Sequence, residues 1–174
     1  MSALGRLRKI LEADIVWKKF KRQMKAVEDP ELDSRLEELK MLHASRKTRT
    51  LNSGFPTGRK VAEAAAQEMA VRGRCVEIVM QETIASNHMA VAIDTIKKYI
   101  GAKHYVTMQE LGIKGVNDRK ELVSALLNPY NRMHDRVNTV IEIADLVIKD
   151  CDQASFSLSR VTDALEIAVK RENV

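Results

Sequence analysis

The chain has 174 residues, of which 45% are hydrophobic and 30% charged, a composition typical of one folded domain and too apolar for wholesale disorder. Only 7 Gly and 3 Pro occur, which favours helices over a β-sandwich. No apolar run approaches the ~18 residues of a membrane-spanning helix, and no secretory signal is expected at the N-terminus. Because Cys75 and Cys151 stand alone, we expect a protein of the reducing cytoplasm with no membrane partner.

The excess of positive over negative charge is confined to the N-terminal third of the chain. The formal net charge is +5, but residues 1–60 hold 15 Lys/Arg against 8 Asp/Glu, whereas residues 61–174 hold 14 against 16. Such an asymmetry indicates a polyanionic partner and says nothing about the fold.

Residues 4–27 carry two short apolar stripes that are out of register, with Asp14 between them. This pattern predicts one bent helix or two short ones. In the second half, cations fall opposite the stripe of Trp17, Phe20 and Met24, which makes the segment strongly amphipathic. These cations are Lys18, Lys19, Lys21, Arg22 and Lys25.

The next predicted helix begins at Asp29-Pro30, a capping residue followed by a proline suited to the first helical position. Its apolar stripe of Leu32, Leu36 and Leu39 is narrow and fades near His43. A helix with so thin a stripe is expected to pack on a neighbouring subunit, so we predict a homo-oligomer.

Residues 45–59 lack periodicity and combine Ser, Thr, Asn, Gly and Pro, which predicts a linker. Thr57 is placed to cap the helix that follows. The predicted domains are therefore a basic helical arm with its linker over residues 1–58 and a helical bundle core over residues 59–174. The linker also carries four cations: Arg46, Lys47, Arg49 and Arg59.

Residues 59–100 show a long helical pattern whose apolar stripe changes register after Ser86-Asn87. We expect two consecutive helices or one with a sharp kink, with Ser86 a second cap and Gly101 a stop. The stripe before the change consists of Val61, Ala65, Met69, Val76, Val79, Met80 and Ile84.

Start signals at Thr107, at Asp118 and at Asn128-Pro129 divide the rest of the chain into further helices. The predicted spans are 107–112, 119–127, 129–149 and 158–171. Together with the preceding elements, they predict an all-α helical bundle of about six or seven helices with a basic N-terminal helical arm.

Cations on one helix face, followed by a cationic linker, are suited to phosphate contacts. A second candidate is the segment from Lys97 to Tyr105, where cations alternate with aromatic residues that stack on bases. The plainer interpretations are a solvated helix surface and a helix end that closes the core; a third is an interfacial membrane helix with Trp17 and Phe20 in lipid. The candidate nucleic-acid-binding residues are Lys18, Lys19, Lys21, Arg22, Lys25, Arg46, Lys47, Arg49, Arg59, Lys60, Lys97, Lys98 and Lys103.

The sequence shows no catalytic or metal-binding pattern. The four histidines have no metal-ligand spacing. Glu142 and Asp145 share a helix face but lack a histidine partner, so they are expected to be solvated carboxylates. We therefore expect no cofactor, no metal and no enzyme activity.

The leading hypothesis is a non-catalytic helical protein that binds DNA or RNA through phosphates and assembles with copies of itself or other proteins, as a small viral or phage accessory factor does. The alternative is a structural adaptor or scaffold of a larger protein assembly with no role in nucleic-acid binding.

Overall fold

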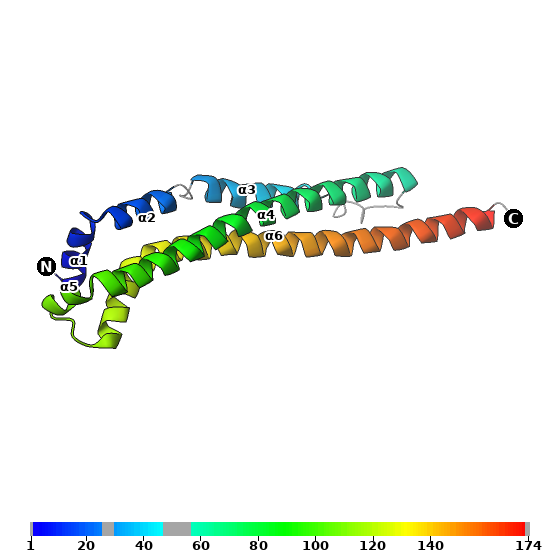
Figure 1. Ribbon diagram of the computed structural model, residues 1–174. Helices are drawn as coiled ribbons and strands as arrows, with labels where there is room; N and C mark the ends of the chain where they lie inside the picture. Colours follow the sequence, from blue (N-terminus) through cyan, green and yellow to red (C-terminus); the bar gives the residue numbers. More distant parts are fainter. Residues whose placement is uncertain (1, 26–29, 47–56, 173–174) are drawn as a thin grey trace. The chain divides into compact units, whose positions relative to one another are not determined.

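The computed structural model describes residues 2–25, 30–46 and 57–172, and over these residues the protein consists of six helices without a strand. The predicted all-α fold is confirmed (Figure 1). The helices are α1 (Ala3–Leu11), α2 (Ile15–Lys25), α3 (Pro30–Ala44), α4 (Gly58–Lys103), α5 (Tyr105–Glu110) and α6 (Val116–Glu172). None of these helices has a stretch that is both long and apolar enough to cross a bilayer.

Two compact units share the long helices α4 and α6. Unit 1 comprises residues 1–31 and 83–138, and unit 2 comprises residues 32–82 and 139–174. This division differs from the predicted one at residue 58. The reason is that α1 and α2 pack on the second half of α4 as part of unit 1, while α3 packs in unit 2.

Unit 2 is built on an antiparallel pair, the first half of α4 and the second half of α6 (Figure 1). Along both helices the buried side chains recur at alternating spacings of three and four residues, the heptad pattern of coiled coils. On α4 these residues are Val61, Ala64, Glu68, Val71, Cys75 and Ile78. On α6 they include Val140, Ala144, Val147, Cys151 and Leu158.

The stripe predicted for the first half of α4 was wrong in part. Met69, Met80 and Ile84 are exposed. A row of residues spaced by four drifts about 40° per step around a helix of 3.6 residues per turn, whereas alternation of three and four keeps one face toward the partner.

Helix α3 lies beside the pair of α4 and α6 and buries Leu32 and Leu39. Arg35 contacts Glu82 at 3.5 Å, and Arg74 donates to Glu38 at 2.6 Å, so ion pairs fasten α3 to α4 along its length. The narrow leucine stripe is thus covered by the chain's own helices, which removes the original reason for expecting a subunit there.

Unit 1 closes around an aromatic cluster. Trp17 and Phe20 of α2 pack at 5.4 Å between ring centroids, and Tyr130 of α6 meets them edge-on at 5.9 and 4.8 Å. The core of this unit further contains Leu7, Leu11, Met24, Met89, Ile96, Ile100, Met108, Val123, Leu126, Leu127 and Val137. The face that a membrane helix would insert into lipid is therefore occupied by protein.

Several helix boundaries lie where the capping and proline signals of the sequence predict them. Asp14 separates α1 from α2, so the N-terminal segment forms two short helices rather than one bent helix. Helix α3 begins at Pro30, while Asp29 lies outside the described residues. The Thr57 hydroxyl accepts from the backbone N–H of Lys60 at 3.4 Å, and α4 begins directly after it.

Other predicted helix boundaries were wrong, because tertiary packing overrides the capping, glycine and proline signals there. Ser86 lies inside α4, where its hydroxyl donates to Asn138 at 2.7 Å and contacts His134 at 2.9 Å. Gly101 lies in the last turn of α4. Pro129 lies inside α6, which continues although an internal proline removes one helical hydrogen bond. Burial of Leu126 and Leu127 before Pro129, and the ring contacts of Tyr130 after it, hold both sides against one core.

The short helices near residue 110 also start earlier than predicted. Thr107 is inside α5, which begins at Tyr105 with His104 before it, and Asp118 is in the first turn of α6. The chain between α5 and α6 turns at Gly112, whose φ of +88° is a conformation that glycine adopts without steric cost. The predicted helix over residues 158–171 is the continuation of α6.

Candidate nucleic-acid interface

Helix α2 presents most of its cations to solvent because three apolar side chains on its opposite face are buried. Trp17, Phe20 and Met24 are buried, which turns the opposite side of the helix to solvent. Lys21 is half-buried and lies 3.8 Å from Glu12. The four fully exposed cations of α2 are Lys18, Lys19, Arg22 and Lys25.

Asp14 fixes the orientation of this cationic helix. Its Oδ1 accepts from the backbone N–H of Val16 at 2.8 Å and of Trp17 at 3.3 Å, which caps α2. Its Oδ2 accepts from the Tyr99 hydroxyl at 2.9 Å and lies 3.3 Å from both Lys103 Nζ and His104 Nε2. The start of α2 is therefore tied to the end of α4 through one buried carboxylate.

The electrostatics of this cluster favour the ionised carboxylate. Burial acts to raise the pKa of Asp14, but the hydrogen bonds from Tyr99, from two backbone N–H groups and from His104 outweigh it and hold that pKa well below its ordinary value. The contacts of Lys103 with Tyr99 and Asp14 raise the pKa of the ammonium group. Both charges are thus present at neutral pH.

The same contacts account for most of the second candidate segment. Tyr99, Lys103 and His104 contact Asp14, which agrees with the plainer interpretation that this helix end closes the core. Lys98 pairs with Asp94 at 2.7 Å. Lys97 is exposed on the same turn of α4.

The remaining candidates lie in unit 2 or outside the described residues. Arg46 is buried in an ion pair. Lys47 and Arg49 lie outside the residues that the structure describes. Arg59 and Lys60 are exposed at the start of α4, with Arg59 3.0 Å from Glu63. The structure therefore groups the α2 cations with Lys97, Lys98 and Lys103 in one unit and leaves Arg59 and Lys60 in the other.

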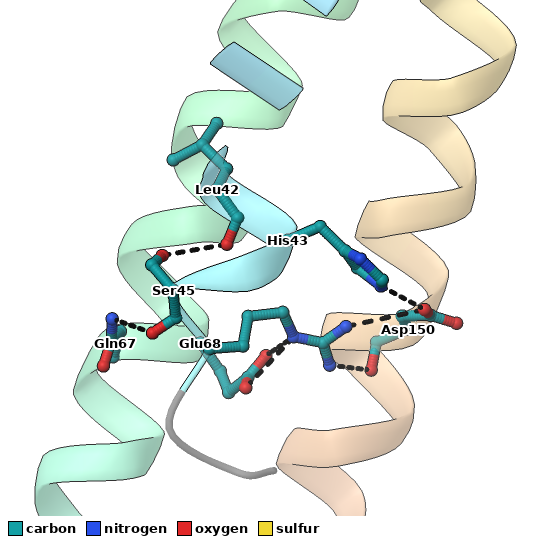
Figure 2. A network of polar contacts seen from close by, with 7 residues as sticks. Leu42, His43, Ser45, Gln67, Glu68 and Asp150 are labelled. Carbon is teal, nitrogen blue, oxygen red and sulfur yellow. Dashed lines mark hydrogen bonds and ion pairs between the residues drawn. The ribbon is translucent and has the colours of Figure 1, made fainter. Parts of the chain in front are cut away.

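The Arg46 guanidinium contacts Glu68 and Asp150, which are labelled in Figure 2. Its Nε donates to both oxygens of Glu68, at 2.8 and 3.2 Å, and its second terminal nitrogen donates to the backbone carbonyl of Asp150 at 2.9 Å. His43 Nε2 lies 3.4 Å from the Asp150 carboxylate. The guanidinium joins α3, α4 and α6 and does not face solvent.

The net charge is also divided unevenly between the two units. Unit 1 holds 16 Lys/Arg and 10 Asp/Glu, a net charge of +6, whereas unit 2 holds 13 and 14, a net charge of −1. Three exposed cations of α1, which the sequence analysis did not select, belong to unit 1: Arg6, Arg8 and Lys9. Their positions outside the apolar stripe of Leu7 and Leu11 are the signal that could have included them.

A groove beside the cationic helix was also missed. It lies between α2 and α4, has a volume of about 750 Å³, and has apolar walls that include Val16, Phe20 and Met89. Lys19 and His88 also line it. Val91 lines this groove and is exposed, and its position carried no sequence signal for the groove.

The described residues contain no group of three or more His, Cys, Asp or Glu side chains arranged to hold a metal ion. Glu142 and Asp145 are exposed. Cys75 and Cys151 are buried free thiols. Burial and a hydrogen bond with Glu68 raise the pKa of Cys151 to about 12, so that thiol is protonated at neutral pH.

No protein-family model matches the chain, and no curated protein or solved structure is significantly similar to it.

Replacing Asp14 tests whether it anchors α2. We expect Asp14→Ala to lower the free energy of unfolding by about 2–3 kcal/mol, since a lost cap costs ~1 kcal/mol and buried partners lose a hydrogen bond worth a further ~1–2 kcal/mol. Chemical unfolding at pH 7, followed by circular dichroism, measures the loss. A loss below about 0.5 kcal/mol would show that the cluster does not hold α2.

The charge of Asp14 gives this anchor a pH dependence. Because the pKa is lowered on folding, the ionised carboxylate contributes its full stabilisation above the pKa of the unfolded chain, about 3.9, and loses it as the pH falls toward the folded value. The stability difference between the parent and Asp14→Asn, measured by urea unfolding, should therefore shrink between pH 5 and pH 2.5. A difference that stays constant over this range would exclude the charged cluster as its source.

Proposed function

We propose that the protein is a non-catalytic nucleic-acid-binding and assembly protein that contacts the phosphates of DNA or RNA through the cationic face of α2. The observation that carries this proposal is the exposure of Lys18, Lys19, Arg22 and Lys25 on one helix of the unit that holds a net charge of +6. Clustered cations on one face are the electrostatic footprint of nucleic-acid binding.

The chemistry of this face suits phosphates rather than bases. Lys18, Arg22 and Lys25 follow one another at spacings of four and three residues and so lie on one side of the helix. Phosphate contacts fix position and carry no sequence information, so weak sequence preference is expected. The proposal omits Arg46, because its guanidinium is engaged by Glu68 and Asp150.

The proposal includes self-association and an action in the cytoplasm, in keeping with two free thiols in the described residues. A small viral or phage accessory factor remains the setting that we propose. The second candidate function is a structural adaptor or scaffold of a larger protein assembly. It is favoured by helices of 46 and 57 residues, which offer long surfaces for partner proteins.

Fluorescence-anisotropy titrations with single- and double-stranded DNA and RNA at several salt concentrations test the proposal. If the four exposed α2 cations each meet one phosphate of duplex DNA, log K should fall with log salt at a slope of roughly −3 to −4. Duplexes of unrelated sequence should bind alike. Absence of salt-dependent binding to all four nucleic acids would contradict the proposal and favour the adaptor.

A further inference from the structure

An apolar groove runs between the first turns of α4 and the last turns of α6, within unit 2. Its volume is about 700 Å³. Val61, Ala62, Ala65 and Met69 line it from α4, and residues that include Leu165 line it from α6. Met69 is 70% exposed although it is a large apolar residue, so this surface leaves apolar area in contact with water.

The groove continues an interface that already exists inside the chain. The alternation of three and four residues that buries Cys151 and Leu158 extends on α6 to Val161 and Leu165. These two are only partly buried against the cluster of Val61, Ala64 and Leu158. The heptad pattern therefore continues to a part of α6 that the described residues cover only partly.

Helix α3 lies beside only part of the pair formed by α4 and α6 in unit 2. Helix α3 stops at Ala44, and Arg46, two residues later, reaches α4 at Glu68. Residues 58–67 of α4 precede that level, and the end of α6 extends past the first turn of α4 (Figure 1). No third described helix covers this part of the pair.

The charge around the groove argues against a polyanion or another strongly charged partner. Glu166 and Lys170 line it four residues apart on α6, with opposite charge. On α4, Arg59 lies 3.0 Å from Glu63. A surface that is apolar and nearly neutral does not repel an identical surface, and a two-fold axis can place Glu166 of one copy near Lys170 of the other.

We propose that this groove binds the same groove of a second copy of the chain, which completes a four-helix arrangement at the open end of unit 2. The row of small residues at Gly58, Ala62 and Ala65 leaves room for larger side chains such as Met69 and Leu165 of the other copy. This inference names the surface for the self-association included in the proposed function and rests on it only to that extent.

The size of the surface predicts a weak dimer. Sixteen residues of α6, from 155 to 170, span about 24 Å, and two helices are about 20 Å wide, so each copy offers on the order of 500 Å². A total near 1,000 Å² lies at the low end of specific interfaces. We expect association at micromolar to tens of micromolar protein.

Analytical ultracentrifugation of the full chain from 1 to 100 μM tests the proposal with matched variants. The double variant Ala62→Glu/Met69→Glu places charge in the groove at two exposed positions, so the monomer should keep its helicity. Met80→Glu is the control, because Met80 is 63% exposed on the same helix outside the groove. We expect the parent and the control to dimerise and the double variant to remain monomeric at 100 μM.

A parent chain that is monomeric at 100 μM would overturn the proposal, as would a double variant that dimerises like the parent. Loss of dimer in the control as well would show that the surface lies elsewhere. Anisotropy titration of the double variant with a duplex too short for two copies separates this test from the proposed function. Its affinity should match that of the parent, since the α2 cations belong to unit 1.

Discussion

Glu68→Ala should lower the free energy of unfolding by about 3–5 kcal/mol, because it removes the buried counter-charge of Arg46 and leaves only the half-exposed Asp150 carboxylate, 3.5 Å away. Glu68 is fully buried and the Arg46 side chain is 7% exposed, with 2.8 Å between Nε and the nearer carboxylate oxygen. Desolvating an uncompensated charge costs far more than losing a surface ion pair. Urea unfolding at pH 7 provides the measurement.

Two further variants separate this effect from a general effect of losing a carboxylate. Glu63→Ala removes the partner of Arg59, whose side chain is 89% exposed, and should change stability by less than about 1 kcal/mol. Arg46→Leu combined with Glu68→Leu removes both buried charges and should recover most of the loss. If Glu68→Ala costs no more than Glu63→Ala, the buried pair does not hold α3 to α4.

The same pair explains why the seam of unit 2 could not be predicted from the sequence. Glu68 occupies a core position of the heptad, and Ala64 and Cys75 beside it are small, so the apolar pattern is interrupted where burial is complete. The exposed methionines at positions 69 and 80 supplied a stronger apolar signal than the true seam. Burial of a glutamate becomes predictable only when its partner is known, and Arg46 lies 22 residues earlier in the chain.

Helix existence was predictable, whereas helix length was not. Composition and periodicity predict helices over nearly all the described residues, and Asp14 and Thr57 mark two of their starts through local hydrogen bonds. Ser86 and Pro129 are start signals of the same kind, yet both lie inside long helices because their neighbours pack on one core. Local rules govern a boundary only where tertiary packing does not oppose them.

The candidate interface was likewise predictable only in part. The cationic face of α2 follows from the positions of its own residues, since Trp17, Phe20 and Met24 determine which side is buried. The environment of Arg46 and the cluster around Asp14 depend on residues about 20 to 100 positions away, which periodicity does not reveal. Arg46 became a binding candidate because of the composition of the linker around it. That composition does not reveal its distant partners, Glu68 and Asp150.

Replacing Lys18, Lys19 and Arg22 together by Gln should weaken nucleic-acid binding about a hundredfold near 0.15 M salt. Each phosphate contact contributes about 0.9 to the slope of log K against log salt, so the slope should flatten by about 2.7. The loss should be similar for every duplex sequence. The fold should survive, because all three side chains are exposed and the buried face of α2 is unchanged.

The matched control neutralises three exposed cations of unit 2, as Lys40→Gln, Lys149→Gln and Arg160→Gln. Both triple variants change the net charge equally, so a loss confined to the α2 variant assigns binding to local contacts, whereas equal losses would assign it to the overall charge. If the α2 variant binds as tightly as the parent, α2 is not the binding surface. Lys97 and Lys98 would then be tested next, and the adaptor function would gain support as the role of the α2 cations.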